Sequence, residues 1–228
     1  MRVWDIHPGY LNRESLLGEH REVHAVFSVI LNCRKGYARH PETMRWRGCM
    51  GALVVRHGII VQEMMLRGYH HHSPGPEVAM SPWPEVYINP PFEQFDVLAR
   101  KYHGKHHGRI PLPHNTQQLW AQHKYSVLAR DPELYKRIGP LAANRKGEQC
   151  FRELSRTLAE ALRTGPSQGG IMNALLHMWG YVSGLDPAQR HYPEAPAELI
   201  REIQRRSILH GVSYLQESTA LSELACWV

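Results

Sequence analysis

A repeated helical pattern near the N-terminus places the strongest constraint on the fold of this chain. From Arg13 to Cys33, apolar residues recur at the spacing of one helix face, and Asn12 stands before them as a suitable N-cap. These apolar residues are Leu16, Leu17, Val23, Val26, Phe27, Ile30 and Leu31. Similar periodicity predicts further helices over 42–67, 117–129, 148–163, 172–183 and 198–215. We therefore predict an all-α fold.

A proline-rich stretch separates two groups of predicted helices. Residues 70–113 contain 8 of the 16 prolines, including those of the run SPWPEVYINPPF, and are predicted to be largely irregular. We place the domain boundary at its end, which gives an N-terminal domain over 1–113 and a C-terminal helical domain over 114–228. The 228 residues suffice for one large or two small domains with a buried core.

Composition narrows the cellular setting. The four cysteines are widely spaced without a CxxC pair, which favours reduced thiols over a disulfide framework or a zinc ribbon. No apolar stretch approaches the length of a membrane span, and Asp5 and His7 lie where a signal peptide would be apolar. We expect a cytoplasmic protein. The formal net charge of +6 points to a polyanionic partner.

The positive charge is concentrated in the segment CRKGYARHPETMRWR. Its basic residues, interleaved with Tyr37 and Trp46, are Arg34, Lys35, Arg39, His40, Arg45 and Arg47. Cations between aromatic rings suit a phosphate backbone with stacked or splayed bases. The alternative is a solvated loop that one or two aromatic side chains anchor to the core.

The N-terminus itself is a candidate nucleophile. An α-amine has an unperturbed pKa of about 7.7–8.0, against about 10.4 for lysine, so more of it is neutral near pH 7. Initiator methionine is normally removed before a small residue, and the large Arg2 predicts that Met1 is retained. Glu22 lies beside the apolar stripe of the first helix. It is a candidate catalytic carboxylate or, alternatively, a salt-bridged surface residue.

Three motifs carry a resemblance to a known family. The stretch RESLLGEHREVHAVF, followed by RKGYARHP and LRGYHHHSP, resembles the pyrimidine-dimer DNA glycosylase/AP lyase family of phage endonuclease V. The resemblance covers roughly the first 75 residues. It implies an endonuclease V-like helical domain that acts on damaged double-stranded DNA. In that family the N-terminal α-amine attacks C1′ of the damaged nucleotide.

The resemblance assigns roles to individual residues. Met1 falls on the nucleophile, Glu22 on the catalytic glutamate, and Arg2 and Arg21 on arginines that would lower the pKa of the amine and bind phosphates. The reaction passes through a Schiff base and β-elimination, and it implies no metal and no cofactor. Ala25 stands where the phage pattern has a further DNA-contacting arginine, a contact that His24 or the segment Arg34–Arg47 would replace.

The histidines suggest other uses. His20 and His24 are one helical turn apart, but the sequence indicates no third ligand for a metal ion beside them. Two further clusters flank or lie within the proline-rich stretch: His70, His71 and His72, and His103, His106 and His107. They are interpreted as pH-sensitive positive surface near nucleic acid or as helix C-terminal caps, with a metal site as the alternative.

The second half carries a resemblance of its own. The stretches LWAQHKYSVLARDPELYKRIGPLAA and PSQGGIMNALLHMWGYVS resemble a widespread bacterial helical domain of uncharacterised function. The candidate site residues of this accessory domain are His123, Lys124, Asn173 and His177. Gly169 and Gly170 would open a helix N-terminus to a phosphate or nucleobase, whereas the alternative makes Asn173 and His177 a hydrogen-bonded core pair.

Together these features favour a bacterial, nucleoid-associated DNA-repair glycosylase with AP lyase activity, and pyrimidine dimers as its lesion. One alternative is a lyase or glycosylase acting on abasic sites or on another modified base. The other is a non-catalytic nucleic-acid-binding module.

Overall fold

The computed structural model describes residues 1–144, 147–186 and 192–228, and over these residues the chain is all-helical, without a strand. The first half holds η1 (Pro8–Tyr10), α1 (Arg13–Leu31), α2 (Pro41–Trp46), α3 (Met50–Leu66) and α4 (Pro91–Lys101). The second half holds α5 (Thr116–Leu128), α6 (Pro132–Asn144), α7 (Glu148–Ala161), α8 (Gln168–Trp179), α9 (Pro196–Leu209), α10 (Ser213–Gln216), α11 (Ala220–Glu223) and η2 (Leu224–Cys226). The predicted all-α class is confirmed.

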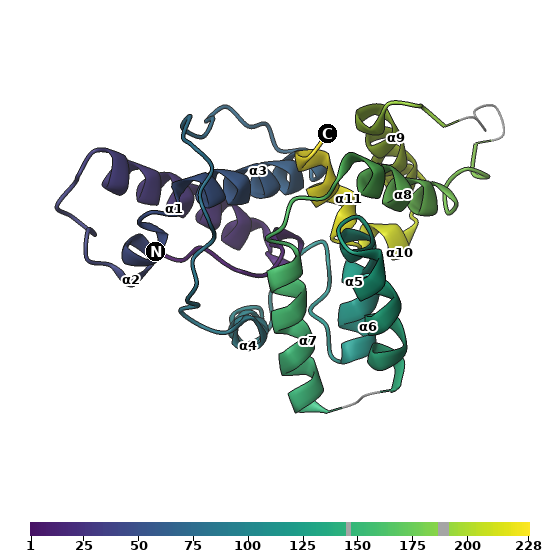
Figure 1. The fold of residues 1–228 in the computed structure, drawn as a ribbon, viewed down its shortest axis with the longest axis horizontal. Coiled ribbons are helices and arrows are strands. Elements are labelled where there is room, and N and C mark those ends of the chain that lie inside the picture. The colour runs from purple at the N-terminus through teal and green to yellow at the C-terminus, as the bar shows by residue number, and fades with distance from the viewer. Residues whose placement is uncertain (145–146, 187–191) are drawn as a thin grey trace.

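The helices form two groups that pack against each other (Figure 1). Helices α1 and α3 lie side by side, α4 packs on α7, and α5 contacts α6, α7 and α8. The short α11 near the C-terminus returns to α3 and so joins the end of the chain to its beginning. One cluster of buried apolar residues includes residues from Val3 to Leu158 and so crosses position 113. The domain boundary at residue 113 stays a prediction.

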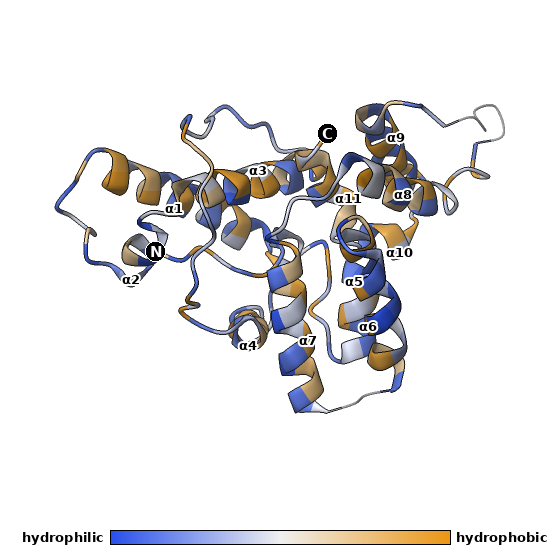
Figure 2. Ribbon diagram, in the orientation of Figure 1, coloured by the Kyte–Doolittle hydropathy of each residue, from blue (hydrophilic) through white to orange (hydrophobic). Residues whose placement is uncertain are grey.

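Helix α1 forms as its sequence predicts. The side chain of Asn12 accepts a hydrogen bond from the backbone N–H of Ser15 at 3.0 Å, which satisfies one of the free donors at the helix start. The apolar stripe of α1 faces the core, where Leu16, Val23 and Val26 are fully buried. In Figure 2, apolar and polar residues likewise occupy different sides of α7.

Two predicted segments differ from the structure. The helix expected over 42–67 is interrupted after α2, where Gly48 adopts a positive φ of 78° that favours glycine. The stretch 70–113, expected to be largely irregular, contains α4. Pro91 stands in the first turn of α4, where its missing N–H costs no helical hydrogen bond. A residue type that disfavours the interior of a helix therefore starts one here.

Helix α6 was not predicted. Asp131 caps it by accepting a hydrogen bond from the N–H of Leu134 at 2.8 Å, and Pro132 stands in its first turn. The last predicted helix, over 198–215, ends at Leu209, because Gly211 with a φ of 62° turns the chain before α10.

Within the described residues, no helix combines the length and the apolar character that a membrane crossing requires.

Candidate active site

The structure brings the N-terminal amine to the carboxylate of Glu22. The α-amino nitrogen of Met1 lies 4.0 Å from Oε2 of Glu22 on α1. The side chain of Met1 is only 6% exposed and packs against the core, which fixes the amine, whereas the side chain of Glu22 is 38% exposed. The pair therefore combines an anchored amine with a carboxylate that solvent and a substrate can reach.

A buried ion pair holds the N-terminal segment in this position. Glu19, one turn before Glu22 on α1, accepts a hydrogen bond from the backbone N–H of Trp4 at 2.8 Å. Its carboxylate also receives Arg56 of α3 at 2.7–2.9 Å, and a further Arg56 nitrogen donates to the carbonyl of Ile6. Glu19 and Arg56 thus fasten the first six residues to α1 and α3. Neither role is readable from sequence, because the two residues are separated by 37 positions.

Asp5 provides a second anchor for the same segment. Its carboxylate accepts hydrogen bonds from both terminal nitrogens of Arg45, at 2.9 and 3.1 Å, and from Arg163 at 3.1 Å. Gln94 of α4 donates to the same carboxylate and accepts from the backbone N–H of Asp5. These contacts tie the N-terminal segment to α2, to α4 and to the residues after α7.

The two arginines assigned by resemblance lie in different environments. Arg2 donates to the side-chain oxygen of Asn89 and lies over the ring of Trp4, 4.7 Å from its centroid. A second terminal nitrogen of Arg2, Nη1, is buried without a hydrogen-bond partner among the described residues. Arg21 is exposed, and its Nε donates to the carbonyl of Leu17. Arg21 therefore presents its guanidinium group to solvent on the helix that carries Glu22.

The basic segment predicted to bind DNA contains both exposed and buried residues in the structure. Four of its cations are exposed: Arg34, Lys35, Arg39 and Arg47. Tyr37, which is 69% exposed, lines a shallow hollow together with Lys35 and Arg39. His40 is half-buried, and its Nδ1 accepts from the N–H of Glu42 as the cap of α2.

Arg45 and Trp46 do not belong to this exposed surface. The side chain of Arg45 is 2% exposed and paired with Asp5, and Trp46 is fully buried. A guanidinium group enclosed by a buried carboxylate is not available to a phosphate, so Arg45 stabilises the fold. The assignment of Arg45 to DNA binding is therefore corrected.

Four histidines meet between α1, α3 and the segment that follows α3. His20 and His24 of α1, His57 of α3 and His71 after α3 each offer a ring nitrogen, and these nitrogens lie within 4.8 Å of one another. The sequence indicated no third ligand beside His20 and His24, and the structure supplies two. His24 faces His57, its Nε2 3.1 Å from that ring, rather than a separate DNA surface. Burial and the neighbouring imidazoles lower the pKa of His20 and of His57 to about 4.

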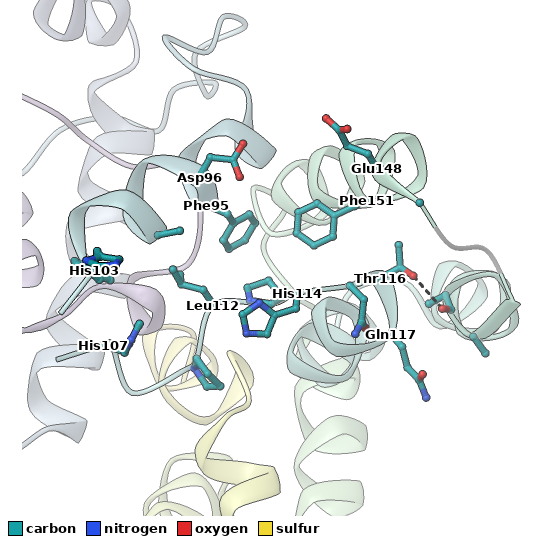
Figure 3. Close-up of a pocket in the computed structure, with 18 of the residues that line it drawn as sticks. Phe95, Asp96, His103, His107, Leu112, His114, Thr116, Gln117, Glu148 and Phe151 are labelled. Carbon is teal, nitrogen blue, oxygen red and sulfur yellow. Dashed lines mark hydrogen bonds between the residues drawn. The ribbon is translucent and has the colours of Figure 1, made fainter. Parts of the chain in front are cut away.

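A large cavity of about 1140 Å³ lies elsewhere, between α4 and the first turns of α5 and α7 (Figure 3). Phe95 and Phe151 point toward one another in it, with ring centroids 5.8 Å apart. Of the second predicted histidine cluster, His103 and His107 line this cavity and His106 is exposed. These rings therefore do not gather at one point as His20, His24, His57 and His71 do.

The candidate residues of the second half do not form one site. His123 is buried and its Nδ1 lies 3.3 Å from the hydroxyl of Tyr10, so it belongs to the contact between the two halves. Lys124 lies over the rings of Tyr125 and Tyr214, 4.6 and 4.7 Å from their centroids. This arrangement places the two neighbouring residues His123 and Lys124 in different surroundings.

Asn173 and His177 are both exposed on α8, which excludes the core-pair alternative. The N-terminus of α8 is also closed to an anion at Gly170. Its N–H donates to Ser167, and a Cβ there would lie 2.1 Å from the carbonyl oxygen of Ala129. Gly170 thus permits the close packing of α8 on α5.

Two protein families match the chain, one in each half. Residues 1–75 match the pyrimidine dimer DNA glycosylase family. The match covers Met1, Glu22 and all four clustered histidines, and it supports a pyrimidine dimer DNA glycosylase-like function. Residues 124–192 match a family of proteins of unknown function, DUF1722, which starts after His123 and includes Lys124, Asn173 and His177. No curated protein and no solved structure matches the chain.

Proposed function

We propose that this protein is a DNA glycosylase with AP lyase activity that acts on pyrimidine dimers in double-stranded DNA. The observation that carries the proposal is the 4.0 Å approach of the Met1 amine to the Glu22 carboxylate, inside the segment that matches the glycosylase family. An amine and a carboxylate suffice for Schiff-base chemistry at a sugar carbon.

In the proposed reaction, the neutral Met1 amine attacks C1′ of the damaged nucleotide and the bond from C1′ to the base breaks. The nitrogen loses a proton, the sugar ring opens, and a protonated imine joins Met1 to C1′. Its positive charge acidifies C2′, so that removal of a C2′ proton expels the 3′ phosphate by β-elimination. Water then hydrolyses the imine and restores the amine. Glu22 stabilises the cationic intermediate and transfers protons during ring opening and elimination.

The proposed DNA-binding residues are cations of the same half. Arg21, Arg34, Lys35, Arg39 and Arg47 are exposed, and Arg2 lies next to the amine. Exposed guanidinium and ammonium groups bind phosphates and supply affinity that does not depend on sequence. Because C1′ is inaccessible in a stacked duplex, the enzyme must also extrude a nucleotide at a cost of a few kcal/mol, which damage reduces.

Borohydride trapping tests the proposal. The full chain is incubated with duplexes that contain a pyrimidine dimer, an abasic site or no lesion, and the reductant fixes any imine as a stable amine. We expect an adduct with the dimer duplex, mapped to Met1 by peptide mass. An adduct with the abasic duplex alone would assign lyase activity without dimer excision, and no adduct with either would leave a non-catalytic binding module.

Two variants separate chemistry from binding. Glu22→Gln is expected to reduce strand cleavage by about 10²- to 10⁴-fold, the usual contribution of a positioned acid or base, with DNA affinity retained. Glu14→Gln removes an exposed carboxylate from the first turn of the same helix and serves as the matched control. Equal cleavage by both variants would remove Glu22 from the mechanism.

A further inference from the structure

The four clustered histidines have the geometry of a metal site. Nε2 of His57 lies 3.1 Å from Nε2 of His24 and 3.2 Å from Nε2 of His20. In a tetrahedral zinc site with Zn–N bonds of about 2.0–2.1 Å, neighbouring nitrogens are separated by about 3.3 Å. The observed separations therefore match two edges of such a tetrahedron.

Hydrogen bonding among neutral rings does not account for the cluster. Each Nε2 carries either a proton or a lone pair, and in both cases it has a single in-plane direction for a partner. His57 nevertheless faces two other Nε2 atoms. Nε2 of His71 is buried and has no hydrogen-bond partner within the described part of the chain, although its ring lies 5.1 Å from that of His20. Buried polar atoms are normally paired, so an unpaired nitrogen here points to a bound ligand.

The fold holds three of the four rings on rigid elements. His20 and His24 are at positions i and i+4 of α1, so they share a helix face, and His57 faces them from α3. The segment that follows His71 lies against His57, because a Cβ added at Gly75 would come within 3.4 Å of Nδ1 of that ring. A metal ion would thus meet a largely preformed set of ligands.

We propose that one divalent transition-metal ion binds to the four clustered histidines, His20, His24, His57 and His71. Zinc is the ion used to test the site. Imidazole nitrogens are suitable ligands for zinc, copper, iron and nickel. The filled d shell of zinc imposes no coordination geometry, so zinc accepts four ligands in a tetrahedral arrangement. Four protein ligands close the coordination sphere, which is typical of structural sites. The ion fastens the segment at residue 71 to α1, the helix that carries Glu22. This site shares no residue with the Met1–Glu22 pair.

Metal titration of the full chain tests this site. The protein is stripped with a chelator and then titrated with zinc against a chromophoric competitor, and separately with cobalt, whose tetrahedral complexes absorb strongly in the visible range. We expect one zinc per chain, a tetrahedral cobalt spectrum and a higher melting temperature with zinc. Binding of no metal, or a six-coordinate cobalt spectrum, would overturn the proposal.

Matched variants locate the ion. His71→Ala removes one proposed ligand, whereas His72→Ala removes the exposed histidine next to it. His71→Ala is expected to weaken zinc binding by more than about tenfold, the smallest loss that even outer-shell substitutions give, and to abolish the stabilisation by zinc. His72→Ala should behave as the unmodified protein. Equal zinc affinity in the two variants would exclude the proposed ligand set. Circular dichroism of the zinc-free variants checks that both remain folded.

Discussion

Arg56 donates three hydrogen bonds to the carboxylate of Glu19, one helical turn before Glu22. The same carboxylate accepts the N–H of Trp4, so the position of the N-terminal amine depends on an ion pair that takes no part in the proposed chemistry. Glu19 is a positioning residue in this arrangement.

Glu19→Gln should destabilise the protein and impair trapping of DNA at Met1. The substitution leaves the charge of Arg56 buried without its counter-ion, a change that typically costs about 3–5 kcal/mol. Because burial raises the pKa of Glu19 to about 7, urea unfolding at pH 8 measures the loss where the carboxylate is ionised. Borohydride trapping at saturating DNA measures the effect on the amine. Glu14→Gln on the same helix is the control, and a Glu19→Gln variant of normal stability would refute the anchoring role.

Glu63→Gln should lower the stability of the protein at neutral pH and make that stability less sensitive to a fall in pH. Glu63 accepts hydrogen bonds from Arg67, Arg109 and Ser222, and it links α3 to α11. Although burial opposes its ionisation, Arg109 and Arg67 hold the pKa of Glu63 well below its usual range.

A carboxyl group with a lowered pKa in the folded state stabilises above its unfolded pKa of about 4.3, and this stability is lost as the pH falls further. Urea midpoints of the unmodified chain and of Glu63→Gln are compared at pH 7 and pH 4. The difference between the two proteins should shrink at pH 4. A constant difference would contradict the linkage.

The chain should lose stability between pH 6.5 and pH 4 through buried neutral histidines. Burial lowers the pKa of His123 to about 4, against about 6.5 in an unfolded chain. The unfolded state therefore takes up the proton first, and the stability is complete above pH 6.5 and declines toward pH 4. One such group contributes a slope of up to about 1.4 kcal/mol per pH unit. His123→Gln should show a shallower slope than the exposed control His177→Gln, as measured by urea unfolding across this range.

Exposed and buried cations of the basic segment should respond differently to substitution. Lys35→Ala combined with Arg39→Ala is expected to weaken binding to duplex DNA without changing the melting temperature. The slope of log affinity against log salt should fall by about 1.8 in magnitude, because two phosphate contacts are lost. Arg201→Ala removes an exposed cation from α9 and is the control. Arg45→Ala should instead unfold at a lower temperature, since buried Asp5 loses one of its two arginine partners. An unchanged salt slope in the double variant would place DNA elsewhere.

The sequence predicts local structure where local rules decide it. The Asn12 cap and the stripe of α1 follow from neighbouring residues, and so does the all-α class. The start of α4 was missed because a proline is also a favourable first-turn residue, a distinction that composition alone does not make. The break at Gly48 depends on one backbone angle within an otherwise helical pattern.

The candidate site was predictable only in part. Motif resemblance proposed Met1 and Glu22, which the structure places together. The partner of Glu19 and the ligands that join His20 and His24 lie 33 or more positions away in sequence, so that only the packing of α3 on α1 reveals them. Burial of Arg45 likewise depends on Asp5, 40 positions distant.

Asp5, four residues from the proposed nucleophile, receives a hydrogen bond from Arg163, which belongs to the second half of the chain. Removing that half would leave a buried carboxylate short of one of its cations and would loosen the segment that ends in the amine. Through Arg163, the region that matches a family of unknown function thus helps to hold the segment that carries the proposed nucleophile. A fragment of residues 1–75 alone would lack Arg163 and therefore one of the contacts that hold the proposed nucleophile in place.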